Sequence, residues 1–296
     1  MTIRKKLIPE NWTARHWFKR LFIDLIILAA LLLIAGLFFK NQIMFQPDYE
    51  TFSTPAAYGA AYSGFELKTK KGWALKGWHL PAPENANGLT ILFFHGISRN
   101  MSMLTDRLVL LNQAGFEIVT LDWPGFGQSE GSPSEETVYE AAELAWGWLA
   151  SRGIKPENTI IYGFSLGGGA ASYLTQKYDP AALILDSTFT RLRDVPSTLL
   201  PALKPYFYLI LGDSFNTGAR LNSIRCPLLV IHSNEDDVVP YALGEANFQA
   251  YSNGPKLLAS GKGDHMGFVL NEKLYMGKIK ELEAVLSGRF SGQSPR

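Results

Sequence analysis

Apolar residues recur along this chain in two patterns, and each pattern predicts one kind of element. Short runs rich in Leu, Ile and Phe, polar only at their ends, are typical of strands covered on both faces of a sheet. Longer amphipathic segments lie between these runs and are typical of helices. The predicted strands are residues 89–94, 116–122, 159–162, 182–185, 228–231 and 256–259, and the predicted helices are residues 103–113, 135–152, 166–178, 241–251 and 271–286.

This alternation of strand and helix predicts an α/β fold with a mostly parallel sheet and helices on both faces. Two earlier segments, residues 65–69 and 73–80, alternate like a hairpin and are expected as antiparallel strands at one edge of the sheet. In such sheets functional residues gather at the carboxyl ends of the strands. We expect one catalytic domain over residues 44–286, followed by a small, polar and flexible tail over residues 287–296.

One segment near the amino terminus is apolar on every side. Residues 25–39 include no charged or strongly polar side chain, and residues 21–39 give 19 positions, which cross roughly 28 Å of hydrocarbon at ~1.5 Å per residue. A cleaved signal peptide usually has a shorter apolar core and a small-residue cleavage site, whereas a core helix is rarely apolar all round. We therefore predict an uncleaved transmembrane signal anchor at residues 21–39.

Charge on either side of this segment predicts its orientation. Residues 1–20 contain six basic side chains against Glu10 alone, whereas Lys40 on the other side is followed by Asp48 and Glu50. Basic flanks stay on the cytoplasmic side of a membrane. The prediction is a single-pass protein with residues 1–20 in the cytoplasm and the catalytic domain on the non-cytoplasmic side, which is periplasmic if the source is bacterial.

Overall charge and cysteine content narrow the classes of partner. The 28 basic and 27 acidic residues nearly cancel, so no global field attracts a polyanion, and nucleic acid is not expected as a partner. The single cysteine, Cys226, excludes an internal disulfide and a thiolate metal cluster. No metal site is predicted.

The motif with the clearest chemistry is Gly163-Phe164-Ser165-Leu166-Gly167, a G-x-S-x-G pattern between a predicted strand and a predicted helix. A serine on such a sharp turn occupies a strained backbone position, and glycines on either side let the strand and helix approach closely. An ordinary glycine-rich turn is the alternative. The context favours Ser165 as a nucleophile.

A serine nucleophile needs a base, and the chain has five histidines. Four are set aside by position: one precedes the apolar segment, and the others fall in an early strand, in the loop after residues 89–94, and at the end of residues 228–231; these are His16, His79, His95 and His232. His265 follows the last predicted strand in a glycine-rich turn at the correct edge of the sheet. We predict His265 as the general base.

The base in turn needs a carboxylate that holds its tautomer. Residues 228–231 lead into a loop with three acids, of which Asp236 is the predicted member of the triad, while Glu235 and Asp237 are alternatives. Asp186, at the end of the preceding strand, is a further candidate. Serine, aspartate and histidine then follow one another in the chain order expected for this kind of sheet.

Two backbone N–H groups must also face the oxyanion that develops during acyl transfer. The N–H of Leu166, directly after the serine at the start of a helix, is one predicted donor. The loop after residues 89–94 contains His95-Gly96-Ile97, and the N–H of Ile97 is the other.

Together these motifs resemble the α/β-hydrolase superfamily over about residues 44–286, and most closely its membrane-anchored Bem46-like branch, related to monoacylglycerol lipases and serine aminopeptidases. The resemblance rests on five ordered motifs, namely His95-Gly96, residues 122–131, residues 163–168, residues 236–240 and Gly263-Asp264-His265. It implies an eight-stranded sheet, a Ser165-Asp236-His265 triad with oxyanion donors at Ile97 and Leu166, and no cofactor. Trp123-Pro124, Ile97 and Ser233 depart from the residues of many relatives, which affects the expected pocket rather than the triad.

The expected activity is hydrolysis of a carboxylic ester through an acyl-enzyme. Residues 187–226 include the apolar segments 199–203 and 206–211, which favour a small cap over the site, with an ordinary packed helix as the alternative. A cap beside a membrane favours small-molecule or lipid esters, or thioesters, as substrates. A peptidase or amidase with the same triad, and a hydrolase-like binding protein without activity, remain as alternative functions.

Overall fold

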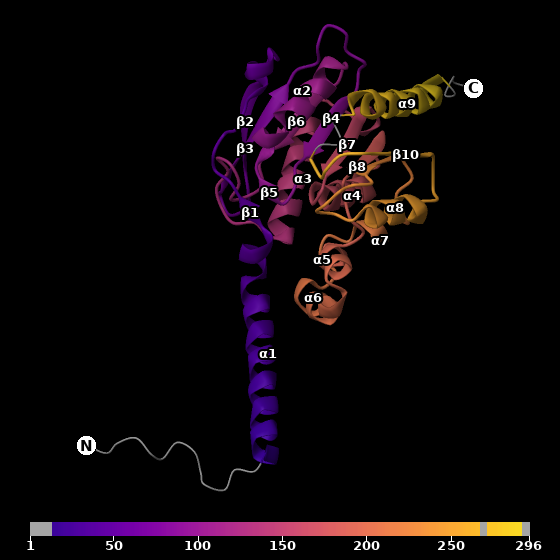
Figure 1. Cartoon of the computed structure of the whole chain (residues 1–296). Coiled ribbons are helices and arrows are strands. Elements are labelled where there is room, and N and C mark those ends of the chain that lie inside the picture. Colours follow the sequence, from indigo (N-terminus) through magenta and orange to yellow (C-terminus); the bar gives the residue numbers. More distant parts are fainter. Residues whose placement is uncertain (1–13, 267–270, 292–296) are drawn as a thin grey trace. The chain divides into compact units, whose positions relative to one another are not determined.

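The computed structural model describes residues 14–266 and 271–291 of the 296-residue chain, with side chains described up to residue 288 (Figure 1). The chain divides into two compact units between Ile43 and Met44. The first contains one helix, and the second contains the sheet and the remaining helices.

All of α1 (Ala14–Met44) except its last residue belongs to the first unit, and this helix of 31 residues includes the whole of the apolar segment predicted from the sequence. Its length is about 46 Å at ~1.5 Å per residue. Most of its large apolar side chains are about half exposed, for example Leu25, Leu31 and Phe39. Length and composition make α1 a helix that can cross a membrane. Three of the six basic residues of the predicted cytoplasmic flank lie in residues 1–13, outside the described residues.

The second unit is built on an eight-stranded sheet, as the resemblance implied, with the order β10-β9-β8-β7-β4-β6-β3-β2. Neighbouring strands from β10 to β6 run parallel, whereas β3 is antiparallel to both β6 and β2. The strands are β2 (Ser63–Lys68), β3 (Ala74–Leu80), β4 (Thr90–Phe94), β6 (Glu117–Leu121), β7 (Thr159–Phe164), β8 (Ala182–Asp186), β9 (Leu228–Ser233) and β10 (Lys256–Gly261).

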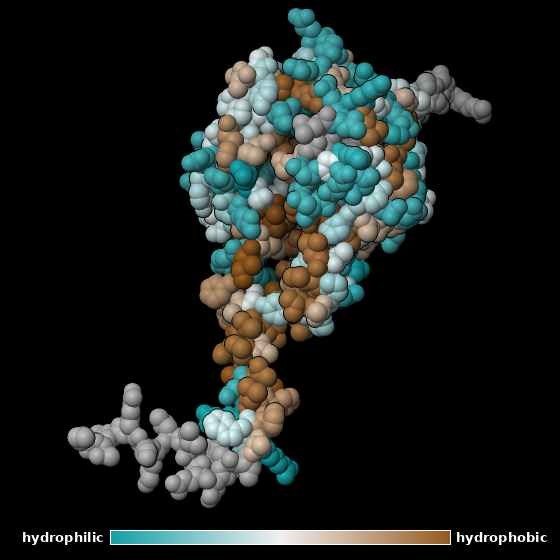
Figure 2. Space-filling view, in the orientation of Figure 1, coloured by the Kyte–Doolittle hydropathy of each residue, from teal (hydrophilic) through white to brown (hydrophobic). Residues whose placement is uncertain are grey.

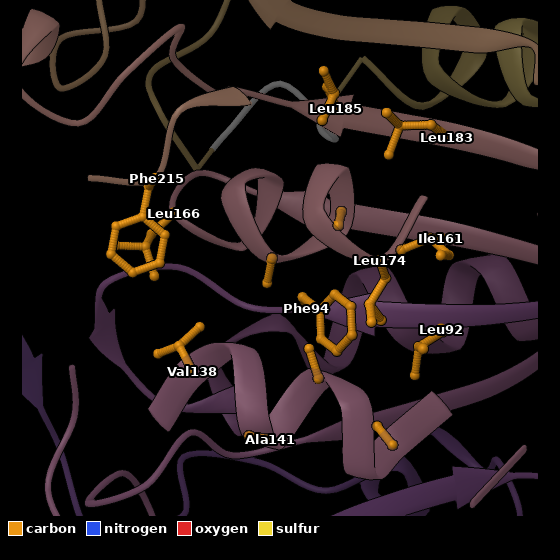
Figure 3. Close-up of a cluster of buried hydrophobic side chains, with 14 of the residues drawn as sticks. Leu92, Phe94, Val138, Ala141, Ile161, Leu166, Leu174, Leu183, Leu185 and Phe215 are labelled. Carbon is orange, nitrogen blue, oxygen red and sulfur yellow. The ribbon is translucent and has the colours of Figure 1, made fainter. Parts of the chain in front are cut away.

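Alternate residues of the central strands supply two separate cores, one on each face of the sheet. On β4, Leu92 and Phe94 belong to the core beneath α3 (Glu135–Ser151) and α4 (Gly167–Tyr178), part of which Figure 3 shows. Ile91 and Phe93 belong to the opposite core, with α2 (Thr105–Gln113) and α9 (Glu272–Ser291). α8 (Tyr241–Ala250) packs on the α4 side through Leu243 and Phe248. Helices therefore cover both faces, as the pattern of the sequence predicts.

Residues 187–226 lie between β8 and β9 and form short helices, namely α5 (Asp194–Leu199), η4 (Pro201–Leu203), α6 (Lys204–Leu211) and α7 (Thr217–Leu221). Leu199, Leu200, Leu203 and Leu209 are each about half exposed or more. Apolar surface gathers over this segment in Figure 2. This segment is the one for which the sequence predicts a cap.

Two features differ from the expectations. β1 (Gln46–Pro47) pairs in parallel with β5 (Ser98–Arg99) in a small separate sheet, which no periodicity indicates because each strand has only two residues. α9 continues to Ser291, five residues into the predicted tail, and the Ser287 hydroxyl donates to the Glu283 carbonyl at 2.9 Å. Small polar residues are therefore compatible with the exposed end of this helix. The rest of the tail, residues 292–296, lies outside the described residues.

Candidate active site

The turn between β7 and α4 holds Ser165 in a left-handed backbone conformation, with φ of +52°. The Ser165 N–H donates to the Asp186 carbonyl at 2.8 Å, which fixes this turn against β8. A Cβ at Gly163 would collide with the backbone of Gly167, and one at Gly167 with the backbone of Phe94. The two glycines are therefore required for the close approach of strand and helix, and the serine sits at the sharp bend between them.

A cavity of about 320 Å³ opens beside this turn, and both Ser165 and His265 line it. Its other described walls come from the loop and short helix after β4, the loop after β9 and the loop after β10. All these segments follow the carboxyl ends of parallel strands, as expected for an open α/β sheet. None of the lining residues found in the described part of the chain belongs to residues 187–226.

His265 contacts Asp236 directly. The His265 Nδ1 lies 2.8 Å from Asp236 Oδ2, and the Asp236 side chain is fully buried. The N–H groups of Val238 and Val239 donate to the other carboxylate oxygen at 2.9 and 2.8 Å. This geometry suits a carboxylate that orients an imidazole and stabilises its protonated form.

The three other acids considered in the sequence lie elsewhere. Asp237 lines the cavity, and its Oδ1 accepts the backbone N–H of His265 at 3.4 Å. Glu235 is exposed and lies 3.8 Å from Lys262. Asp186 is buried and forms an ion pair with Arg107 at 2.7 Å. Of the four candidate acids, Asp236 is the one whose carboxylate lies next to a ring nitrogen of His265.

His232 is a neighbour of this pair that the sequence reasoning set aside. It is fully buried at the end of β9, with Nε2 3.3 Å from Asp236 Oδ2 and 2.9 Å from the Val239 carbonyl. Burial raises the pKa of Asp236, but the hydrogen bonds from His232 and His265 outweigh it and hold that pKa well below its usual range. The sequence contained a signal for this contact. His232 lies at the end of a predicted strand and precedes Asp236 by four residues, so the loop between them can bring the two side chains together.

The two predicted oxyanion donors lie beside Ser165. Leu166 follows the serine directly at the start of α4, where N–H groups have no partner within the helix. Ile97 lines the cavity, and its carbonyl accepts the Gln46 N–H at 3.1 Å, which holds the loop after β4 in place. A Cβ at Gly96 would lie 3.3 Å from the Ser165 Cβ, so this loop passes close to the serine.

Below this loop lies a buried pair, His95 and Asp122. Burial lowers the pKa of His95 to about 3 and raises that of Asp122 to about 7. The Trp123 N–H points at His95 Nε2 at 3.3 Å, and the Met101 N–H donates to Asp122 Oδ1 at 2.7 Å. A neutral imidazole and a partly protonated carboxyl at neutral pH connect the loop after β4 to the end of β6 without an ion pair.

A second buried network connects α2 to the cavity. Arg107 donates to Asp186 at 2.7 Å and to the Met266 carbonyl at 3.2 Å, and its guanidinium lies 4.6 Å from the centre of the Phe164 ring. Phe164 in turn contacts the His265 ring at a centroid distance of 5.0 Å. Arg107 follows Leu104 by three residues and precedes Leu111 by four, which places it on the apolar stripe of the helix. This position in the sequence indicates a buried arginine that needs a partner.

No cluster of three or more histidine, cysteine or acidic side chains able to hold a metal ion is found within residues 14–266 and 271–291.

Comparison with known proteins agrees with this architecture. A family model described as the alpha/beta hydrolase fold matches residues 90–214. An uncharacterised protein of Mycobacterium tuberculosis is 33% identical over 60% of this chain and 63% of its own. The lysophosphatidylserine lipase ABHD12 of Danio rerio is 34% identical over 52% of this chain and 45% of its own. The chain thus spans less than two thirds of the length of these relatives.

The solved structure of an esterase from Pyrococcus furiosus superposes with a TM-score of 0.62 over 81% of this chain and 97% of that one, at 20% sequence identity. At that identity the likeness shows the fold. The sheet order, the matched family model and these relatives lead to the same conclusion: the chain has the α/β-hydrolase fold.

Proposed function

We propose that this protein is a membrane-anchored serine hydrolase that cleaves carboxylic esters through an acyl-enzyme, with Ser165 as nucleophile, His265 as base and Asp236 as the acid. The observation that carries the proposal is the 2.8 Å contact between His265 and Asp236 at a cavity that Ser165 also lines. An ordinary glycine-rich turn would not need a serine at positive φ in the wall of a cavity that it shares with a histidine whose partner is a buried carboxylate.

In the proposed reaction the Ser165 hydroxyl attacks the ester carbonyl while His265 Nε2 takes its proton. The carbonyl oxygen becomes an oxyanion facing the N–H groups of Ile97 and Leu166. The tetrahedral intermediate collapses, the alcohol leaves with the proton from His265, and an acyl-serine remains. Water, deprotonated by His265, then attacks the acyl group and releases the carboxylic acid. Asp236 stays ionised throughout and stabilises the protonated imidazole.

The lining of the cavity supports an acyl ester as the substrate. Ile97, Met103, Leu104, Phe164 and Val238 give it an apolar wall next to the serine. A lipid ester or thioester is compatible with this wall, and the name of a lysophosphatidylserine lipase among the similar proteins favours ester chemistry.

The apolar helix α1 supports the membrane part of the proposal. We infer that it acts as an uncleaved signal anchor, with its basic amino-terminal flank in the cytoplasm and the catalytic unit on the other side. Lipid esters would then be available to the enzyme in the membrane that holds it.

The proposal is tested by replacing the nucleophile. Ser165→Ala in the full chain, purified in a neutral detergent, should lower turnover of p-nitrophenyl butyrate by at least about 10³-fold, because no other hydroxyl replaces the nucleophile. Ser187→Ala is a matched control, since Ser187 is buried with positive φ but is not among the described cavity-lining residues. Equal activity of Ser165→Ala and the parent would refute the proposal. A parent that cleaves the matching anilide faster than the ester would favour the amidase alternative.

A further inference from the structure

Arg99, at the end of β5, has a backbone conformation that arginine rarely adopts. Its φ is +62°, in the left-handed region where glycine is the favoured residue because it has no Cβ. The other described non-glycine residues with positive φ are Ser165, Asp179, Ser187 and Phe215. Of these five, Ser165 and Arg99 are found among the described lining residues of the cavity. Strained backbone of this kind is enriched at functional sites, so its presence in the cavity wall points to a role for Arg99.

Surrounding contacts hold this conformation in place. Arg99 pairs with Pro47 in the small parallel sheet of β1 and β5, and its carbonyl accepts the Asp48 N–H at 3.4 Å. Next to it, the Asn100 side chain donates to the carbonyls of Asp48 and Glu50 at 2.9 and 2.7 Å. These contacts therefore fix the backbone at Arg99. An arginine side chain stands in the cavity wall at a position where the backbone conformation favours glycine.

The side chain of Arg99 contacts an aromatic ring and a thioether, and neither contact neutralises its charge. Its guanidinium lies 5.2 Å from the centre of the Phe52 ring, and Nη1 lies 3.7 Å from the Met103 sulfur. No carboxylate forms an ion pair with Arg99 within the described ranges, whereas Arg107 pairs with Asp186. Aromatic and thioether contacts orient a guanidinium without cancelling its charge, so it keeps its capacity for an anion.

Charge is also divided unequally around the cavity. Arg99 lies on the wall that follows β4, together with the oxyanion loop, whereas the acids Asp237 and Asp264 lie on the walls that follow β9 and β10. An anionic group entering the cavity is thus attracted to the Arg99 wall and repelled from the wall that carries Asp237.

We propose that Arg99 binds an anionic group, a phosphate or a carboxylate, on the ester substrate and thereby makes the enzyme prefer anionic esters over neutral ones. This inference rests on the proposed ester hydrolysis. A guanidinium donates two parallel hydrogen bonds to phosphate or carboxylate oxygens, and such bonds are both strong and directional. The acyl group would then occupy the apolar wall, with the scissile carbonyl at Ser165.

Two matched substrate pairs test this preference on the full chain in neutral detergent. The first pair is phenyl butyrate and 4-butyryloxybenzoate, which differ by one carboxylate on a small soluble ester. The second is a monoacylglycerol and its 3-phosphate with the same acyl chain, which differ by one phosphate on a lipid. The quantity measured is the ratio of kcat/KM for the anionic ester to that for the neutral ester, in the parent, Arg99→Gln and Arg99→Gly.

In the parent the ratio should exceed one for at least one pair, and both Arg99 variants should lower it about tenfold. Raising the salt concentration should lower the ratio in the parent more than in the variants. Arg99→Gly should have a thermal unfolding midpoint at or above that of the parent, because glycine adopts the backbone conformation without strain. A change confined to one pair also supports the proposal and identifies the anion as a lipid headgroup or as part of a small soluble ester.

Arg152→Gln is the matched control, since Arg152 also stacks on an aromatic ring, 4.0 Å from the centre of Trp148, but is not among the described residues of the cavity wall. Its ratio should equal that of the parent. An unchanged ratio in both Arg99 variants, or an equal fall of the ratio in the control, would overturn the role proposed for Arg99. It would leave the proposed ester hydrolysis standing. No hydrolysis of any of the four esters by the parent would overturn the proposed function and this inference with it.

Discussion

At the scale of single residues, the histidine and its acid carry most of the proposed chemistry. The Asp236 side chain is completely buried, accepts hydrogen bonds from two backbone N–H groups, and contacts both His265 and His232. Asp237, its immediate neighbour in the chain, reaches only the backbone of His265. Adjacent acids of the same type are therefore expected to differ greatly in their effect on catalysis.

Asp236→Asn should lower kcat by roughly 10³ to 10⁴, because the amide cannot hold the required tautomer or stabilise the imidazolium. Asp237→Asn should stay within several-fold of the parent. Steady-state kinetics with p-nitrophenyl butyrate measures both, with circular dichroism as the check on folding. A larger loss at Asp237 than at Asp236 would overturn the assignment of the acid.

Asp122 gives a prediction about stability and pH. Burial raises the pKa of its carboxyl to about 7, so the folded protein keeps a proton that the unfolded chain releases near its ordinary value of about 4. The free energy of unfolding should therefore fall as pH rises from about 4 to about 7, by up to about 4 kcal/mol from this group.

Asp122→Asn removes this titration and keeps an oxygen for the Met101 N–H. Thermal unfolding midpoints measured from about pH 5 to about pH 8 should fall more steeply in the parent than in the variant. Parallel curves would mean that Asp122 is ionised in the folded protein throughout this range.

At the scale of elements, the hydrophobic pattern predicts the strands of the sheet and the helices that cover it. Each buried strand needs apolar residues on both faces, and each covering helix needs an apolar stripe. The pattern does not predict β1 and β5, which are too short to have one. Contacts between residues far apart in the chain are also missed, such as that of Arg107 with Asp186. Ser165 is predicted as a nucleophile from a local motif, whereas the choice of Asp236 as the partner of His265 had to be made against Glu235, Asp237 and Asp186, because that contact joins residues far apart in the chain.

The buried pair of Arg107 and Asp186 is expected to matter for the stability of the elements around the cavity. Both side chains are about 1% exposed, and the pair joins α2 to β8. Arg107→Met should lower the free energy of unfolding by about 3 to 5 kcal/mol, because it leaves Asp186 buried without its cation. The measurement is chemical unfolding of the full chain in detergent.

The control for this change is Lys76→Met. Lys76 pairs with Glu66 at a similar distance, 2.6 Å, but both side chains are about two-fifths exposed. Solvent screens such a pair, so its loss should cost about 1 kcal/mol or less. Similar losses in the free energy of unfolding for the two variants would contradict the claim that burial makes the pair of Arg107 and Asp186 the more important one for stability.

At the scale of the whole molecule, the sequence predicts the division into an apolar helix and a catalytic unit because the change in composition near residue 40 is abrupt. It does not predict how residues 187–226 relate to the cavity. That segment has an exposed apolar surface, and no residue from it is found among the described cavity-lining residues. A cap over the site therefore remains a prediction. The packing of short helices depends on contacts with distant parts of the chain, which the pattern of apolar residues within a helix does not indicate.

The most direct test of the central claim is labelling of the full chain with a fluorophosphonate probe, followed by mass spectrometry of the modified peptide. Such probes react with serines that a neighbouring base activates. The account predicts one modified residue, Ser165, with labelling lost in Ser165→Ala and strongly slowed in His265→Gln. An unlabelled parent protein that is folded, or a label on another serine, would contradict it.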